Sequence, residues 1–477
     1  MVFVQVEHWR TEDAKRKVAP LCERLRLSEQ VAPYSSRLWT PGLDRAATLH
    51  IDDFSAIPFL VDITGVEEYQ HRARLRARPG DIYAAVTPPT PGYENYCGRW
   101  LGLEPVEMLT ARPDEGPLEL SRACMSPKAW PRLIEFAQAS ERLVIQPFMG
   151  IEPVWELAES LAEESGAEIS VLAPPPPVTW VANDKALFGE VVELVLGSEW
   201  IIPGTLARGV ASMAANLAEL ARRHPRVALK RLRCASAMGN RVYESAMLER
   251  MNEAEIVAEV EQFLAKTEWD GDEAVLAVAW ESAEHSPSTQ LWIPPEDQGP
   301  VRLDGVYEQL LRGEEKVFVG SRPSTLPPLV NHAVGVASIL VASALQSLGY
   351  VGRCSFDFIL TGDPQGDFEV KFTECNGRWG GTSTPMALID RLYPQGRPPY
   401  RARDFVHPSF VGVSFEDLLS ALGEAVWDHR SKNGTFLFYN TGPLRAFGKL
   451  DVIAIGDSQP EADAALEETF SRLLGLS

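Results

Sequence analysis

Four consecutive prolines, Pro174 to Pro177, divide this chain into two parts. Proline lacks a backbone N–H donor and fixes φ, so a run of four continues neither a helix nor a central strand. We therefore place a domain boundary near residue 175. The chain has 477 residues, and at roughly 150 residues per domain this length suggests about three packed units rather than one core.

Composition is that of an ordinary globular protein. Hydrophobic residues make up 45% and charged residues 23% of the sequence, which excludes a largely disordered or collagen-like chain. Acidic residues outnumber basic ones by 66 to 45, and the formal charge of −21 opposes nonspecific binding to nucleic acid or to an anionic membrane surface. We therefore expect neither nucleic acid nor a membrane as a partner.

Cysteine usage and the N-terminal sequence both favour a cytoplasmic protein. The first residues, MVFVQVEHWRTEDAKRK, lack the basic start and long apolar stretch of a secretory signal. The longest apolar stretch, Ala333–Leu345, stops well short of the ~20 residues of a membrane span and predicts a buried helix. The cysteines show no C-x-x-C pair and no histidine at metal-ligand spacing, which predicts reduced thiols at Cys22, Cys97, Cys124, Cys234, Cys354 and Cys375.

Before the prolines, the pattern is that of an α/β unit. Leu143–Ile145 is a short apolar run, typical of a buried parallel strand. Trp155–Ser165 has helical periodicity, and Glu168–Leu172 predicts a second strand. A strand, a helix and a strand in this order predict an α/β N-terminal domain.

After the prolines, the pattern favours an α+β arrangement with two hairpins. Arg226–Leu232 is rich in β-forming residues and is followed by the loop Cys234–Asn240, which predicts the first hairpin. Strands Cys354–Leu360 and Phe368–Cys375 flank the turn Gly362–Gly366 and predict the second. The other predicted elements are helices at Asp184–Leu196, Leu206–Arg223, Glu244–Lys266, Ala333–Leu348 and Ser414–His429, strands at Ala274–Trp280, Thr435–Tyr439 and Lys449–Ile455, a turn-rich segment at Gln298–Pro328 and a closing helix from Glu461.

The second hairpin carries the most informative residues. Glu374 and Asn376 stand two apart on one strand, so their side chains emerge on the same face, and Asp357 lies on the partner strand. Two carboxylates and an amide oxygen on one sheet face suit Mg²⁺, which fills its other positions with water and substrate phosphates. Arg378, two residues beyond Asn376, is placed to meet a phosphoryl group or a developing oxyanion.

The plain alternative is that these acids are solvated positions of an ordinary hairpin. Asp357 and Glu374 argue against it, because they stand inside apolar strands where an unpaired charge is costly.

Two lysines complete the candidate site. Lys230 ends a strand and precedes a loop of small residues containing Gly239, so it can pair with nucleotide phosphates while loop amides close over them. Lys185 follows Asp184, the expected N-cap of a helix, and is free to face a pocket. The alternatives are a solvated strand lysine and an ordinary capped helix start. No P-loop, dinucleotide-binding or nucleophile-elbow motif occurs.

Several pieces in a fixed order resemble the ATP-grasp superfamily. In chain order they are Asn183-Asp184-Lys185, Lys230 with its small-residue loop, a strand ending at Trp280-Glu281, Asp357, and Glu374-Cys-Asn376-Gly-Arg378 followed by Gly-Gly. The E-x-N-x-R segment is the most specific piece. The proline run before Asn183, together with Ser286–Gln290, further resembles the pheganomycin-type peptide-ligase branch, which has a pre-ATP-grasp domain.

The resemblance implies an ATP-grasp fold of α/β and α+β type. It implies an N-terminal α/β pre-ATP-grasp domain at 1–175 and a lid subdomain at 176–275. The C-terminal subdomain would cover 276–477 and contain the Mg²⁺-binding hairpin and an α/β extension. In this fold the two subdomains clasp ATP between them.

The resemblance also implies residue roles. Lys185 and Lys230 would contact ATP phosphates, and Arg378 would join Lys230 as a catalytic residue by steadying the transferred phosphoryl group and the tetrahedral intermediate. Cys375 stands where an aliphatic residue is common, but it alternates to the core side of its strand. The implied metal ligands are Asp357, Glu374 and Asn376. The other implied nucleotide contacts are the lid residues Ala235, Ser236, Ala237, Met238 and Gly239, the adenine-lining Ala279, Trp280 and Glu281, and either Glu281 or Glu284 at the ribose.

The implied activity is ATP-dependent carboxylate–amine ligation. Transfer of the γ-phosphoryl group of ATP to a carboxylate gives an acyl phosphate, from which an amine displaces phosphate, so that ADP and phosphate are released. The substrates would be small-molecule carboxylates and amines, such as amino acids or peptides, and a homodimer is a family-level expectation. The alternatives are an ATP-grasp phosphotransferase acting on a hydroxyl and a noncatalytic nucleotide-binding protein.

Overall fold

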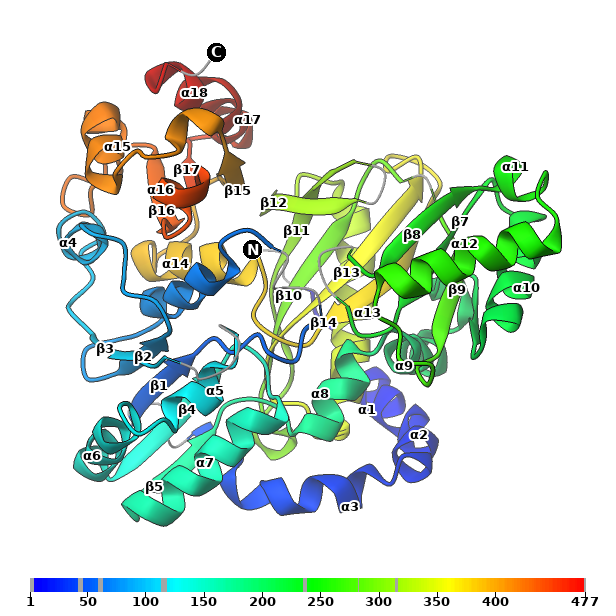
Figure 1. Cartoon of the computed structure of the whole chain (residues 1–477), viewed down its shortest axis with the longest axis horizontal. Helices are drawn as coiled ribbons and strands as arrows, with labels where there is room; N and C mark the ends of the chain where they lie inside the picture. The colour runs from blue at the N-terminus through cyan, green and yellow to red at the C-terminus, as the bar shows by residue number, and fades with distance from the viewer. Residues whose placement is uncertain are drawn as a thin grey trace.

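The strands of this protein form three sheets (Figure 1). The structure is a computed structural model, and it describes the chain except for residues 1–3, 42–45, 59–62, 113–117, 235–237, 282, 314–315 and 476–477. One sheet is parallel and the other two are antiparallel, so the mixed α/β and α+β class predicted from the sequence is confirmed.

The N-terminal sheet is parallel, in the strand order β3-β2-β1-β4-β5. Parallel strands are usually covered on both faces, which accounts for the apolar run Leu143–Ile145. The predicted strand at Leu143–Ile145 is confirmed as part of β4. The strands are β1 Ala47–Ile51, β2 Ile82–Ala85, β3 Glu107–Thr110, β4 Arg142–Pro147 and β5 Glu168–Val171, and the helices are α1 His8–Lys17, α2 Ala19–Arg24, α3 Leu27–Val31, α4 Tyr93–Arg99, α5 Leu120–Cys124, α6 Trp130–Ser140 and α7 Glu152–Ser165.

The proline run lies between this sheet and the next helices. Pro175 is extended, and α8 (Pro176–Asn183) begins at the following proline, in the first turn, where no N–H partner is needed. The side chain of Asp184 then accepts hydrogen bonds from the N–H groups of Ala186 and Leu187, and so caps α9 (Lys185–Leu196). The predicted cap is confirmed.

The second sheet has four antiparallel strands in the order β6-β9-β7-β8. Val227 and Leu229 of β7 pack with α10 and α12 in one core, so the alternate residues, Ala228 and Lys230, point to the opposite face. The predicted hairpin β7–β8 is confirmed. The elements are β6 Gly204–Ala207, β7 Arg226–Arg231, β8 Asn240–Glu244 and β9 Val275–Ala279, with α10 Val210–Ala221, α11 Ser245–Leu248 and α12 Glu253–Lys266.

The third sheet has eight antiparallel strands in the order β14-β13-β10-β11-β12-β15-β17-β16. Its β13–β14 hairpin lies next to the four-stranded sheet, and its C-terminal strands lie above the N-terminal sheet in Figure 1. The strands are β10 Pro287–Ile293, β11 Arg302–Arg312, β12 Val317–Pro323, β13 Gly352–Gly362, β14 Phe368–Asn376, β15 Tyr400–Val406, β16 Phe436–Asn440 and β17 Lys449–Ile455. The helices are α13 Pro328–Ser347, α14 Ser383–Leu392, α15 Phe415–Leu422, α16 Leu444–Phe447, α17 Gln459–Ala464 and α18 Phe470–Leu473.

The apolar helix α13 lies inside the fold. Its length and composition would allow it to cross a membrane, but 72% of its most apolar window is buried within the protein. Val334, Val341 and Leu345 are fully buried in one core with residues of α9, β10 and β13. The buried helix predicted at Ala333–Leu345 is confirmed.

Two predicted helices begin later in the structure than the sequence pattern predicts. The segment predicted as helix from Leu206 starts with β6, which pairs with β9, a partner about 70 residues away. In the segment predicted as helix from Glu244, that residue is the last of β8. Helix α12 begins only after Asn252, whose side chain forms a capping box with Glu255.

Two further predictions were wrong in part. Gln298–Pro328, predicted as turns, contains β11 and β12 in the middle of the eight-stranded sheet. The helix predicted at Ser414–His429 ends at Leu422, before Gly423 at φ 52°.

Candidate functional site

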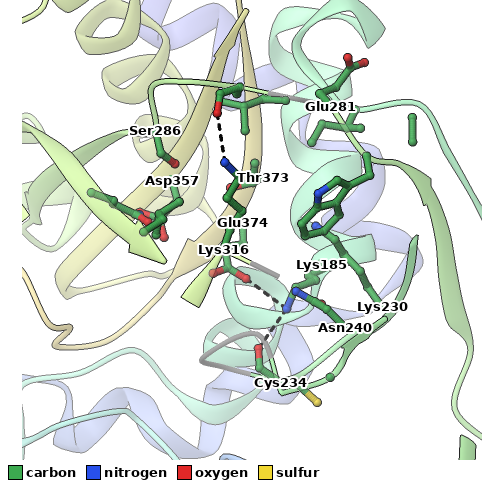
Figure 2. Close-up of a pocket in the computed structure, with 18 residues that line it drawn as sticks. Lys185, Lys230, Cys234, Asn240, Glu281, Ser286, Lys316, Asp357, Thr373 and Glu374 are labelled. Carbon is green, nitrogen blue, oxygen red and sulfur yellow. Dashed lines mark hydrogen bonds and ion pairs between the residues drawn. The ribbon is translucent and has the colours of Figure 1, made fainter. Parts of the chain in front are cut away.

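A pocket lies between the face of the four-stranded sheet opposite its helices and the β13–β14 hairpin (Figure 2). It is lined by residues from segments far apart in the sequence. Of the residues predicted for the site, it brings together Lys185, Lys230, Gly239, Ala279, Trp280, Glu281, Asp357 and Glu374. The predicted pieces, which are far apart along the sequence, therefore meet at one place in the fold.

Asp357 and Glu374 face each other across the β13–β14 ladder. Asp357 is only 8% exposed, and it accepts hydrogen bonds from Ser288 Oγ at 2.8 Å and Asn376 Nδ2 at 2.7 Å. Burial and the nearby negative charge of Glu374 raise the pKa of Asp357 to about 7. Burial also acts to raise the pKa of Glu374, but Lys185, Lys230 and Arg378 outweigh it and hold that pKa below its ordinary value. The pair concentrates negative charge that a cation can offset.

Lys185 is held between the hairpin and the loop after β7. Its Nζ lies 3.1 Å from Glu374 Oε2 and donates to the backbone oxygen of Cys234 at 3.0 Å (Figure 2). The Asp184 cap fixes the first turn of α9, from which this side chain projects. The sequence predicts that Lys185 is free to face a pocket, and in the structure Lys185 lines one.

Lys230 belongs to the four-stranded sheet, on the other side of the pocket from the hairpin, and it is buried. It is 9% exposed, and its Nζ lies 5.1 Å from the ring centroid of Trp280, a cation–π distance. Burial and the positive charge of Lys185 lower the pKa of Lys230 to about 8. A lysine in this position gains from a polyanionic ligand, which would replace the solvation that it has lost.

Arg378 and Asn376 lie beyond the pocket wall. Neither lines the pocket; Asn376 donates to Asp357, and the Nη1 of Arg378 donates to Asn183 Oδ1 at 2.7 Å. The same Asn183 oxygen accepts from the N–H of Gly377 at 3.1 Å, so the end of α8 is joined to the exit of β14. Sequence reasoning placed Asn183 only as part of a motif and missed this link.

The remaining predicted contacts divide into three groups. Of the two glutamates considered for the ribose, Glu281 lines the pocket, whereas Glu284 is exposed and does not. Met238 is also outside the lining set, although the neighbouring Gly239 is in it. The predicted lid residues Ala235, Ser236 and Ala237 lie outside the described residues.

Sequence reasoning missed several lining residues. Asn240 follows Gly239 directly and could have been included as the end of the loop. Gln309 and Lys316 come from the segment predicted as turns, so no strand periodicity pointed to them. Lys316 donates to the backbone oxygen of Ala283 at 3.3 Å and adds a third lysine to the pocket. The other lining residues are Ile202, Cys234, Ala283, Ser286, Leu311, Ile359 and Thr373.

The hairpin fits a hard divalent cation. In the described part of the chain no group of three or more His, Cys, Asp or Glu side chains gathers at metal-binding distance. The donor set is instead two opposed carboxylates and the amide of Asn376, whose oxygen is not used in its bond to Asp357. Mg²⁺ suits such a set, because it usually takes one or two carboxylates and completes its shell with water and phosphate oxygens.

Solved structures with the same overall fold cover nearly the whole chain. An N5-carboxyaminoimidazole ribonucleotide synthetase in its ADP complex gives a TM-score of 0.54 at 12% identity, over 92% of this chain and 99% of that chain. The N5-carboxyaminoimidazole synthase of Aspergillus clavatus, with ADP and its ribonucleotide, gives 0.53 at 12% identity, over 90% and 99%. Biotin carboxylase from Campylobacter jejuni gives 0.51 at 13% identity, over 88% and 90%.

These likenesses establish the fold alone, and the predicted ATP-grasp fold is confirmed. No protein-family model matches the sequence, and no curated protein matches it.

Proposed function

We propose that this protein is an ATP-dependent carboxylate–amine ligase that works through an acyl phosphate. The observation that carries the proposal is the convergence of Lys185, Lys230, Asp357 and Glu374 on one pocket. Three of these side chains are mostly buried, and buried charge of both signs is expected where a charged ligand completes the site. The ATP-grasp fold and the ADP bound in two solved structures of that fold agree with a nucleotide ligand.

The reaction needs two transfers. In the first, a carboxylate oxygen of the substrate attacks the γ-phosphorus of ATP, and the bond from that phosphorus to the β–γ bridging oxygen breaks, so ADP leaves with the electron pair. In the second, an amine nitrogen attacks the acyl carbon, the amine loses a proton to solvent and phosphate departs. The products are an amide, ADP and phosphate.

The residues of the pocket serve charge stabilisation and positioning. Lys185 and Lys230 would stabilise the negative charge of the terminal phosphates while the γ-phosphoryl group is transferred. Trp280, beside Lys230, and Glu281 would lie against the nucleoside. Arg378 would reach the transferred phosphoryl group or the oxyanion after leaving Asn183. No protein nucleophile is needed.

Asp357, Glu374 and Asn376 would hold Mg²⁺, which when bound supplies positive charge beside the triphosphate.

The wider expectations belong to the same proposal. We propose that 1–175 is the pre-ATP-grasp domain, 176–275 the lid subdomain and 276–477 the C-terminal subdomain with its extension. The substrates would be an amino acid or peptide acid and an amine, as in the pheganomycin-type peptide-ligase branch. The protein would act in the cytoplasm, as a homodimer.

Product analysis tests the reaction. Incubation with MgATP and a panel of amino acids, peptides and amines should give ADP, phosphate and amide in equal amounts. Stoichiometric AMP and pyrophosphate would contradict acyl phosphate chemistry. A stable phosphorylated product formed without an amine would instead support the phosphotransferase alternative. ATP binding without turnover across the panel would support a noncatalytic protein.

A further inference from the structure

A second and larger cleft lies over the N-terminal sheet, away from the nucleotide pocket. Its floor includes Thr48 and His50 of β1 and Gln146 of β4, which share one face of that sheet. Its opposite wall comes from β10, β13 and α14 of the third sheet and its helices. The cleft volume is about 1440 Å³, above the roughly 300–1,000 Å³ of ordinary small-molecule sites. It has room for an organic ligand.

The lining of this cleft is positively charged in a chain with a net charge of −21. Arginines gather on it from several segments: Arg76, Arg78, Arg302, Arg353 and Arg391. The carboxylates that line it are Asp81 and Asp390, and it has no lining lysine or glutamate among the described residues. Such a local excess of arginine is not expected from composition.

Both lining carboxylates already have partners. Asp81 accepts from the backbone N–H groups of Thr48 at 2.9 Å and Arg78 at 2.7 Å, and it lies 3.1 Å from the ring of His50. Asp390 accepts from both guanidinium nitrogens of Arg397 that face it. Asp390 is therefore neutralised by Arg397, whereas Asp81 keeps its charge and offsets part of the positive charge of the cleft.

Arg78 and Arg391 are left without a carboxylate. Neither forms an ion pair with any described residue, and Arg391 donates only to the neutral backbone oxygens of Leu75 at 3.0 Å and Ala77 at 2.8 Å. Burial, together with the positive charges of Arg74 and Arg78, lowers the pKa of Arg391. Asp81 acts on Arg391 in the opposite direction but forms no ion pair with it, and two guanidinium groups without a bonded carboxylate favour an anion between or beside them.

Tryptophans supply the apolar part of the lining. The guanidinium carbons of Arg76 and Arg353 lie 4.5 Å and 5.6 Å from the ring centroid of Trp379. Trp292 meets Arg353 at 5.6 Å and Trp39 edge-on at 6.0 Å. The arginines stacked on these rings are also paired with Asp52 and Asp304, so they act here as flat walls.

The cleft is distinct from the nucleotide pocket but shares a sheet face with it. Arg353 and Asp357 are four residues apart on β13, so their side chains emerge on the same face. At the usual rise of about 3.3 Å per residue they are about 13 Å apart along the strand. A ligand in the cleft does not occupy the place of the triphosphate.

We propose that this arginine–tryptophan cleft binds a small organic carboxylate with an aromatic or apolar body, its charge toward Arg78 and Arg391 and its body against the tryptophans. The proposal does not rest on the ligase activity, because binding is measured without ATP.

A matched pair of probes tests the proposal. N-acetyl-L-phenylalanine and its C-terminal amide have the same body and differ in the negative charge. By isothermal titration calorimetry at fixed ionic strength, the acid should bind at least tenfold more tightly than the amide. Equal affinities would overturn the proposal. Inorganic phosphate should bind more weakly than the acid because it lacks the body; phosphate binding as tightly as the acid would overturn the choice of an organic carboxylate.

Variants locate the probe. Arg78→Gln removes an exposed charge with no side-chain partner among the described residues and should weaken binding of the acid by about three- to tenfold. Arg391→Gln should weaken it by a similar factor. Arg112→Gln, at an exposed arginine outside the cleft, is the control and should leave it unchanged. Unchanged binding in both cleft variants, or loss of binding on addition of ADP, would refute the assignment.

Discussion

The acid end of the β13–β14 hairpin consists of Asp357 and Glu374, which face lysines. The arginine end begins four residues away on the same face of β13, where Arg353 lies against the ring of Trp379. The acid end holds Asp357 with a pKa of about 7, because its charge is buried beside that of Glu374. At the arginine end Arg353 is paired with Asp304, whereas Arg391 donates only to backbone oxygens. The two ends therefore differ in the sign of the charge that a ligand would bring: we propose a cation with a polyanion at the acid end and a single organic anion at the arginine end.

The largest effect should come from removing Glu374. Glu374→Ala should lower ATP turnover more than about 1,000-fold, because the side chain holds Lys185 and is a proposed metal ligand. Glu374→Gln, which keeps the shape, should lose nearly as much. Addition of EDTA should abolish turnover of the parent.

The matched control is Glu369→Ala on the same strand, where the glutamate side chain is 71% exposed and pairs with Lys371. Turnover of this variant should stay near the parent value. Equal losses at both positions would show that the acid end has no special role.

Lys230→Met should separate activity from stability. ATP turnover should fall by about 100- to 1,000-fold, as for loss of one charge-stabilising group. Stability should rise, because the pKa of Lys230 falls from 10.5 unfolded to about 8 folded. Between these pH values the unfolded lysine holds a proton that the folded one has lost, so stability of the parent rises with pH in this window and is reduced below it.

Urea unfolding at pH 7 and pH 10 checks the sign. Lys230→Met should gain up to about 3 kcal/mol over the parent at pH 7 and less at pH 10. Lys128→Met, at an exposed lysine, should change neither. A destabilised variant at pH 7 would show that the folded protein favours the charged lysine even without a ligand.

Asp357→Asn should produce a smaller, pH-dependent change. The folded-state pKa of about 7 lies above the ordinary 3.8, so the parent loses stability as pH rises between these values. The variant should therefore melt a few degrees higher than the parent at pH 8 and similarly at pH 4. Mg²⁺ should raise the melting temperature of the parent at pH 8 but not that of the variant; an equal rise in both would place the metal elsewhere.

The smallest effect is expected for the stability of Arg78→Gln. The side chain is exposed and has no partner among the described residues, so the free energy of unfolding should change by less than about 0.5 kcal/mol. Denaturant titration checks this value. A loss well above it would mean that the arginine is held by the fold rather than left for an anion.

Local chemistry made part of this molecule predictable from its sequence. Asp184 was recognisable as a cap, and Asp357 and Glu374 were recognisable because carboxylates inside apolar strands need a reason. Cys375 was placed on the core side by strand alternation, and it is 4% exposed in a core cluster. These inferences needed only neighbouring residues.

The other features depend on contacts between segments far apart in the sequence, which a local sequence pattern does not show. Strand β11 contains Gly305 and four charged residues in the sequence RLDGVYEQLLR, and it is a strand because β10 and β12 pair with it on both sides. β6 likewise depends on β9. The arginines of the second cleft come from the N-terminal part, β11, β13 and α14, and no sequence spacing links them.

The amide oxygen of Asn183 receives both the N–H of Gly377 and the guanidinium of Arg378. It therefore joins the end of α8 to the exit of β14, and α9 and β14 share one core, in which Lys185 is paired with Glu374. Lys230 belongs to a sheet with a core of its own. Because the two cores are separate, we expect a change in the width of the pocket to move Lys230 relative to Glu374.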